Sequence, residues 1–203
     1  MDSKRVIMVP FLREQISELK SGDYVYLTGT LYSARDAAHK RLFDSIVEAD
    51  DRAAGLSGRE LYDQGILPLD ITDNIFYYLG PTPAKEGQVI GSAGPTTSSR
   101  MDKYTPLLLG KGLTGMIGKG KRSKEVIDAI VANKAVYFAA VGGAGALLSK
   151  CIKKSEVIAY DDLGTEAIRR MEVENFPVIV VIDSEGNNLY ETAVEEYNRS
   201  KEK

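Results

Sequence analysis

The chain of 203 residues has little cysteine and little histidine, one of each, Cys151 and His39. A single cysteine excludes an internal disulfide framework. It also excludes a conventional iron–sulfur or zinc site built by this chain alone, because such sites take several thiolate, imidazole or carboxylate ligands. Any metal that the protein uses must be held mostly by something else. For Cys151 itself, the alanine- and leucine-rich segment before it favours a small core residue.

The sequence also lacks a basic excess and a long apolar run. Its net charge of −3 argues against a nucleic-acid partner, which would favour a basic protein. No apolar run approaches the roughly 20 residues that span a bilayer. The first residues, "MDSKRVIMVPFLREQ", hold only a short apolar segment flanked by charges, which is not typical of a signal peptide. We therefore predict a cytoplasmic protein without a membrane partner. Residues 1–203 are treated as one domain, with a charged tail from about residue 193.

Apolar periodicity predicts alternating strands and helices. The predicted strands cover residues 5–11, 24–30, 74–80, 87–94, 113–118, 135–141, 156–160 and 176–182, the last entering a hairpin with residues 189–192. The predicted helices cover residues 34–49, a short turn at 58–64, a segment from Arg100 that restarts at Pro106, and residues 124–133, 142–152 and 165–172. Ser33 and Ser123 are the expected N-caps of two of these helices. The alternation indicates an α/β domain with a mixed sheet.

Two glycine-rich stretches are candidates for phosphate-binding loops. "GMIGKGKRS" is not a P-loop, because Lys119 is followed by Gly120 rather than by a hydroxyl residue. "VGGAGAL" follows a predicted strand, but Leu148 stands where the last glycine of a dinucleotide-binding motif belongs. Close packing of a helix on the sheet explains its glycines equally well. A phosphate-ligand enzyme stays as an alternative.

Two arginines occupy equivalent positions, each after a predicted strand and in a predicted helix start. They are Arg35 in "TLYSARDAAH" and Arg100 in "GPTTSSRMD". The helix macrodipole opposes a cation in the first turn by about 0.3–1 kcal/mol, so we predict that each guanidinium faces an anion. The hydroxyls of Thr96 and Thr97 add donors, and an arginine fork matches a carboxylate. The alternative is that the hydroxyl residues only cap a helix and the arginines are solvated.

Two further residues are candidates by their neighbours. His39 lies four residues after Arg35, so the two share a face of the predicted helix. Lys119 stands between two glycines, which leave a ligand room to approach. The alternatives are a structural histidine and an ordinary surface lysine.

At these residues the chain resembles the β subunit, or carboxy-terminal domain, of the class I fumarase and L(+)-tartrate dehydratase family of iron–sulfur hydro-lyases. The resemblance covers almost the whole chain. It rests on "LTGTLYSARDAAHKR", "YYLGPTP", "GSAGPTTSSRMDKY", "GKGKRS", "AVGGAGAL" and "FPVIVVIDSEGNNLY", in that order. "GPTTxxRMD" together with "ARDAAHxR" is a specific combination, whereas the glycine motifs alone are not.

The resemblance implies a swivelling-type β/β/α domain with a mixed central sheet flanked by helices. It implies a hetero-oligomer in which an α subunit, rather than this chain, holds a [4Fe–4S] cluster. It makes Thr96 the catalytic base and places His39 in a catalytic motif. It makes Arg35, Arg100 and Lys119 the residues that bind the substrate carboxylates. Thr97, in the same loop as Arg100, is a further predicted substrate-binding residue. No residue of this chain is a metal ligand in this scheme.

The expected activity is the reversible hydration of fumarate to malate, with developing charge on a carboxylate met by the cationic side chains. Tartrate dehydratase activity is the alternative within the family, because both substrates present two carboxylates. Outside that class, the same two arginine motifs suit a non-catalytic dicarboxylate-binding module.

Overall fold

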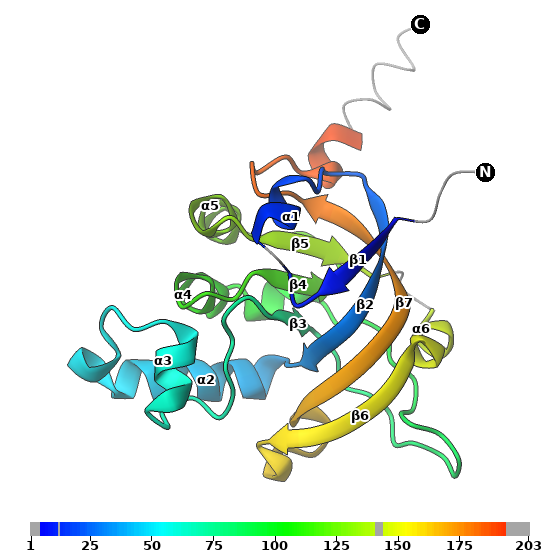
Figure 1. The fold of residues 1–203 in the computed structure, drawn as a ribbon, viewed down its shortest axis with the longest axis horizontal. Coiled ribbons are helices and arrows are strands. Elements are labelled where there is room, and N and C mark those ends of the chain that lie inside the picture. Colours follow the sequence, from blue (N-terminus) through cyan, green and yellow to red (C-terminus); the bar gives the residue numbers. More distant parts are fainter. Residues whose placement is uncertain (1–4, 12, 141–143, 194–203) are drawn as a thin grey trace, which may run out of the picture.

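A computed structural model describes residues 5–11, 13–140 and 144–193 as an α/β domain with helices around a seven-stranded mixed sheet (Figure 1). The strand order is β1-β2-β3-β4-β5-β7-β6. The strands are β1 (Val6–Val9), β2 (Tyr24–Ser33), β3 (Ile75–Tyr77), β4 (Gly115–Gly118), β5 (Val136–Ala139), β6 (Ile152–Ala159) and β7 (Ile168–Ile182).

Helices connect these strands. The α-helices are α1 (Arg13–Ser17), α2 (Asp36–Glu48), α3 (Gly58–Asp63), α4 (Thr105–Gly110), α5 (Lys124–Asn133) and α6 (Gly145–Cys151). The 3₁₀-helices are η1 (Asp50–Ala53), η2 (Ser98–Met101) and η3 (Asp161–Glu166). No helix among the described residues is long and apolar enough to cross a membrane.

The long strand β7 closes the sheet into a ring. Strands β2, β3, β4 and β5 pair in parallel, and β7 pairs antiparallel with both β5 and β2. These five strands therefore form a closed circuit, with β1 added beside β2 and β6 beside β7. Figure 1 shows β7 and β6 curving along one side of the molecule while α2 and α3 project from the other. The result is the expected α/β, swivelling-type domain with a mixed sheet.

Side chains alternate between two cores because successive residues of a strand point to opposite faces. In β3, Ile75 and Tyr77 belong to the core inside the ring, whereas Phe76 belongs to the core beneath the helices. In β5, Phe138 and Tyr137 divide in the same way. These side chains are fully buried. The short strands are thus fixed in register by burial on both faces.

Helix α2 confirms the predicted helix at residues 34–49 to within two residues at its start. Its buried face contains Ala38, Leu42 and Ile46, spaced four residues apart, and they pack in the core beneath the helices. That spacing places the three on one stripe of an α-helix. The helix is consequently docked along its length, with its first turn held against the sheet ring.

The predicted N-cap of this helix is wrong. Ser33 is still in β2, where its hydroxyl accepts the backbone N–H of Arg169 at 3.0 Å. The N-cap residue is Arg35, which makes no side-chain cap. Glu166 replaces the cap from far along the chain, because its Oε2 accepts the N–H of Ala37 at 2.8 Å. A carboxylate is also the charge that the positive end of a helix favours.

Two predicted elements near the end of the chain are corrected. Residues 165–172 are not a helix: η3 ends at Glu166 and β7 begins at Ile168. Pairing with β2 and β6 on both sides of β7 overrides the local helical pattern. The terminal hairpin is reduced to one bridge between Ile182 and Asn188, after which residues 189–193 are helical.

The predicted strand at residues 87–94 is also wrong, because the segment is an irregular loop. It folds back on the turn before it, with the N–H of Thr82 donating to the carbonyl of Ser92. The remaining predicted strands and the helices at 58–64 and 124–133 are confirmed, and Ser123 caps the latter as expected. The predicted charged tail and the first glycines of "GGAGA" lie outside the described residues. Cys151 is partly buried and packs against the ring interior, as predicted.

Candidate functional site

The candidate site lies at one edge of the ring, which we call the arginine end. Strands β2, β3 and β4 run parallel, so their carboxyl ends meet at this edge, the edge at which ligands bind in α/β sheets. The loops that follow these strands carry the predicted residues. Arg35 follows β2, Thr96 and Arg100 belong to the loop and 3₁₀-helix after β3, and Lys119 follows β4. Residues distant in the sequence are thereby brought to one edge.

The two predicted arginines meet at a single carboxylate, that of Asp36. Nε of Arg100 lies 2.7 Å from Oδ1 of Asp36, and Nε of Arg35 donates to Oδ2 at 3.2 Å. The Arg100 side chain is 50% exposed and the Arg35 side chain 21%. Charge-assisted contacts of this kind fix the guanidinium planes. The structure therefore brings the two arginine motifs together through an acidic residue at the first position of α2.

Arg35 is held on its other sides as well. Its Nη2 lies 3.1 Å from Oε1 of Glu166, the carboxylate that also caps α2. The opposite flank lies over Gly80, where a Cβ would sit 2.4 Å from Nη1 of the arginine. Any larger residue at position 80 would displace the guanidinium. The anion predicted to face Arg35 is thus supplied, at least in part, by the chain itself.

Thr96 and Lys119 are joined through the backbone. The N–H of Thr96 donates to the carbonyl of Tyr78 at 2.8 Å, and the N–H of Lys119 donates to the carbonyl of Thr96 at 3.3 Å. The stretch around Thr97 therefore runs beside the end of β4 as a short parallel bridge. Among the described residues, the side chains of Thr96 and Lys119 have no hydrogen bond or ion pair. Both are consequently available to a ligand.

A hydroxyl pair beneath this bridge fixes the lysine loop. The hydroxyl of Tyr137 donates to the carbonyl of Gly120 at 2.8 Å, so the Ser98 hydroxyl, 2.8 Å away, donates to Tyr137. A Cβ at Gly118 would lie only 2.0 Å from the Ser98 hydroxyl oxygen. The glycine before Lys119 is therefore required by close packing, and the glycine after it has a φ of +86° that other residues rarely adopt.

A buried arginine that sequence analysis did not single out lies under the same loops. The Arg122 side chain is 0% exposed. Its Nε donates to Oδ1 of Asp102 at 2.7 Å, and its Nη2 donates to the hydroxyl of Thr105 at 2.9 Å. The ring of Tyr137 lies 5.0 Å from the guanidinium carbon. Arg122 thereby links the "GKGKRS" motif, in which it lies, to the "RMD" motif, which contains Asp102.

His39 lies in the layer below Arg35. The side chain is fully buried and packs edge-on against Phe76 and Tyr78. Its Nδ1 donates to the backbone carbonyl of Arg35 at 3.1 Å, since a carbonyl only accepts. Burial lowers the pKa of His39 from 6.5 to about 4, although the carbonyl of Arg35 partly offsets this. The ring is therefore neutral at pH 7, and it contacts the backbone of Arg35 rather than the surface.

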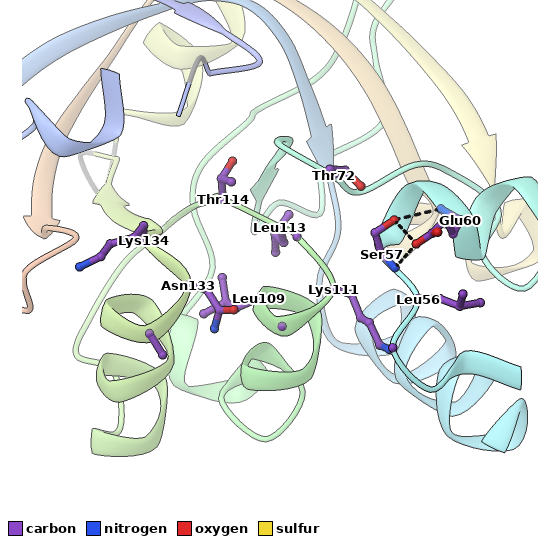
Figure 2. A pocket seen from close by; sticks show the side chains of 14 residues that line it. Leu56, Ser57, Glu60, Thr72, Leu109, Lys111, Leu113, Thr114, Asn133 and Lys134 are labelled. Carbon is purple, nitrogen blue, oxygen red and sulfur yellow. Dashed lines mark hydrogen bonds between the residues drawn. The ribbon is translucent and has the colours of Figure 1, made fainter. Parts of the chain in front are cut away.

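A hollow lies at the opposite end of the strands from the arginine end, and we call it the recess end (Figure 2). Its volume is about 390 Å³. Ser57 and Glu60 lie on one side of it and Lys134 on the other. No arginine lines it, and none of the predicted site residues does. Its lining residues are Gly55, Leu56, Ser57, Glu60, Thr72, Leu109, Gly110, Lys111, Gly112, Leu113, Thr114, Ala132, Asn133 and Lys134.

The described residues do not fit a metal centre. Within residues 5–11, 13–140 and 144–193, no three histidine, cysteine, aspartate or glutamate side chains come together as a possible ligand set. The carboxylates at the arginine end are paired with guanidinium groups instead. Its charged side chains therefore form ion pairs within the chain.

Comparison with known proteins shows the family of the chain. The family described as Fumarase C-terminus matches residues 2–193. The chain is 38% identical over 183 residues to "Fumarate hydratase class I, anaerobic" of Escherichia coli, and 37% identical over 182 residues to "Fumarate hydratase 2" of Leishmania major. These alignments cover 89% and 88% of this chain but 30% and 29% of the relatives. The chain therefore spans about 30% of the length of these relatives.

A third relative is similar over nearly its whole length. The chain is 35% identical over 185 residues to "Putative L(+)-tartrate dehydratase subunit beta" of Methanocaldococcus jannaschii, which covers 88% of this chain and 87% of the relative. The relatives are named as hydro-lyases. The chain belongs to the Fumarase C-terminus family.

Proposed function

We propose that this chain supplies the dicarboxylate-binding and proton-transfer residues of a hydro-lyase that hydrates fumarate reversibly to malate. The observation that carries the proposal is the meeting of Arg35 and Arg100, from separate loops, within reach of one carboxylate. A place that holds two guanidinium groups around an acidic side chain is built to recognise carboxylates. Family membership supports the same reaction class.

The balance of charge favours an anionic ligand. Arg35, Arg100 and Lys119 bring three positive charges to the arginine end, and Asp36 and Glu166 bring two negative charges. One net positive charge remains, carried by an exposed lysine without an ion pair among the described residues. We assign one substrate carboxylate to Arg100 and Lys119, with the hydroxyl of Thr97 as a further donor. Arg35 is less exposed and borders the same space.

We assign proton transfer to Thr96. Hydration of fumarate adds a proton to a carbon beside a carboxylate, and the reverse reaction removes it. A threonine hydroxyl is a weak base at its usual pKa, so it needs cations nearby to stabilise an alkoxide. The backbone N–H of Lys119 donates to the carbonyl of Thr96, and Arg100 follows Thr96 by four residues. His39 is a positioning residue in this proposal, because it holds the backbone of Arg35 from below.

The [4Fe–4S] cluster expected for this class has no fitting ligand set among the described residues. We therefore assign it to a partner α subunit in a cytoplasmic hetero-oligomer. The part of the reaction proposed for this chain is limited to binding the substrate, orienting its carboxylates and moving the proton at Thr96.

A second candidate activity is the dehydration of L(+)-tartrate. One observation supports it: the chain is 35% identical over 185 residues to a relative named as a tartrate dehydratase β subunit. Both substrates offer two carboxylates to the arginine end, so the geometry serves either.

Reconstitution tests the proposal. The full chain is mixed anaerobically with a purified partner that carries the cluster, and fumarate hydration and tartrate dehydration are assayed side by side. We expect conversion of one dicarboxylate by the complex and none by either chain alone. A cluster-loaded complex that converts neither substrate, while the chain still binds dicarboxylates, would identify a non-catalytic binding module. Greater thermal stabilisation by a nucleotide than by dicarboxylates would favour a phosphate-ligand enzyme.

A further inference from the structure

Asp36 lies within the "ARDAAH" stretch but has no role in the proposed function. It is the first residue of α2, and each of its carboxylate oxygens serves a different arginine. Oδ1 is 2.7 Å from Nε of Arg100, and Oδ2 accepts from Nε of Arg35 at 3.2 Å. The Asp36 side chain is 27% exposed, so the contacts are partly shielded from water. One carboxylate therefore sets the separation of two guanidinium groups that come from different loops.

The two arginines depend on Asp36 to different degrees. Arg35 is also held by Glu166 at 3.1 Å and is confined by the close approach of Gly80. Arg100 is half exposed and pairs with no carboxylate other than Asp36 in the part of the chain that the structure describes. Arg35 is thus a fixed point of the site. Arg100 is tethered to that point through Asp36.

We propose that Asp36 is a positioning residue that holds Arg100 at the orientation in which its guanidinium receives a substrate carboxylate. This inference rests on the proposed function, because it assigns Arg100 to the substrate. Asp36 contacts both arginines through their Nε atoms. The Nη edge of a guanidinium can still form a two-point contact with another carboxylate when its Nε side is occupied.

A competing role for Asp36 predicts the opposite effect on binding. If its carboxylate merely filled the substrate position, its removal would relieve competition and lower KM. If it orients Arg100, its removal lets a long, half-exposed side chain sample many rotamers, and the substrate must then order it again. A purely structural role at the first turn of α2 would alter thermal stability without changing KM. The three roles are therefore distinguishable by measurement.

The first experiment compares Asp36→Ala and Asp36→Asn in the reconstituted complex. We expect Asp36→Ala to raise KM for the dicarboxylate about tenfold, with a smaller change in kcat. Asp36→Asn keeps one carbonyl oxygen as an acceptor, so its KM should lie between those of Asp36→Ala and the wild type. The matched control is Asp44→Asn, which breaks an exposed ion pair with Lys40 on the same helix and should leave KM unchanged. An unchanged or lowered KM for Asp36→Ala, in a complex whose wild type is active, overturns the inference alone.

The second experiment needs no activity. NMR relaxation of the Arg100 Nε–H group, assigned with Arg100→Lys, reports how rigidly the isolated chain holds that side chain. We expect an ordered group in the wild type and an order parameter below about 0.6 in Asp36→Ala. Equal order parameters in the two proteins would overturn the inference. If the wild-type complex converted no dicarboxylate, the proposed function would fail, and this measurement would still decide whether Asp36 positions Arg100.

Discussion

The two ends of the strand ring differ in what they offer a ligand. The recess end has a volume of about 390 Å³, and several polar side chains that line it bond within the chain. Glu60 accepts from both the backbone and the hydroxyl of Ser57, and Lys111 donates to the carbonyl of Ala53 at 2.6 Å. The arginine end instead places the half-exposed Arg100 and the less exposed Arg35 around one carboxylate. Hollow volume alone would favour the recess end, whereas the placement of charge favours the arginine end as the proposed dicarboxylate site.

The two ends also differ in what their polar side chains contribute to the fold. Residues of the recess end close helix starts and ends, such as the capping box of α3, and so complete the chain's own structure. At the arginine end, the side chains of Lys119 and Thr96 have no partner among the described residues.

Arg122→Met should be the most damaging change, because it removes the cation buried beneath the arginine end. It leaves Asp102, whose side chain is only 13% exposed, without its counter-ion. Breaking one partner of such a pair typically costs about 3–5 kcal/mol of unfolding free energy. Urea titration followed by circular dichroism measures the loss.

The double variant Arg122→Met, Asp102→Asn separates charge from packing. It should recover part of the lost stability, because it no longer leaves an unpaired buried charge. A single variant as stable as the wild type would show that the network beneath the arginine end is not structurally required. It would also show that the "RMD" and "GKGKRS" motifs do not need the pair of Arg122 and Asp102 to hold them together.

His39 should make the protein less stable in acid. The pKa of His39 is about 4 when folded, below its usual value of 6.5, so only the unfolded chain takes up a proton between these values. Its contribution is complete above pH 6.5 and is lost as the pH falls toward 4. The full shift corresponds to about 3 kcal/mol. His39→Gln should therefore lose roughly 2–3 kcal/mol less than the wild type between pH 7.5 and pH 4.5.

Unfolding free energies of both proteins at the two pH values provide the measurement. Equal losses of unfolding free energy in the two proteins would show that His39 takes up a proton in the folded state by pH 4.5. The ring would then be more accessible than its burial indicates, and a direct catalytic role for His39 would regain support over the positioning role.

Arg100→Ala should lower kcat/KM of the assembled enzyme at least tenfold, or about 1.4 kcal/mol of transition-state stabilisation. The matched control is Arg59→Ala, which removes an exposed arginine that pairs with Asp70 near the recess end. Steady-state kinetics on both variants compares the two ends directly. Near-normal kinetics for Arg100→Ala would remove that residue from the site.

The local sequence pattern was sufficient to predict those helices whose position depends on neighbouring residues. The amphipathic spacing of Ala38, Leu42 and Ile46 predicted α2, and Ser123 predicted the start of α5. The predictions failed where distant pairing decides. Residues 165–172 have a helical pattern, but β2 and β6 draw them into the long strand that closes the ring. Ser33 was a suitable cap by composition, yet β2 continues through it.

The candidate site divides in the same way. The sequence pointed to Arg35 and Arg100 because a cation at a helix start is costly without an anion. That premise holds for Arg35, the N-cap of α2, but not for Arg100, which lies in the last turn of η2. The sequence could not show that Asp36 serves both, because that depends on how two loops meet in space. Arg122 was missed because an arginine in a glycine- and lysine-rich segment resembles a surface residue. Its burial is fixed by Asp102 and Tyr137, which lie in other elements.

The smallest effect is expected at the recess end, for Lys111→Met. The substitution keeps the length of the side chain and removes one hydrogen bond to the carbonyl of Ala53, so it should cost about 1 kcal/mol of stability or less. The kcat/KM of the reconstituted complex should equal that of the wild type, because no proposed substrate contact lies within reach. A tenfold loss of kcat/KM with unchanged stability would move the functional site to the recess end. The paired arginines would then be a structural feature of the ring, and the charge argument for dicarboxylate binding would fail with them.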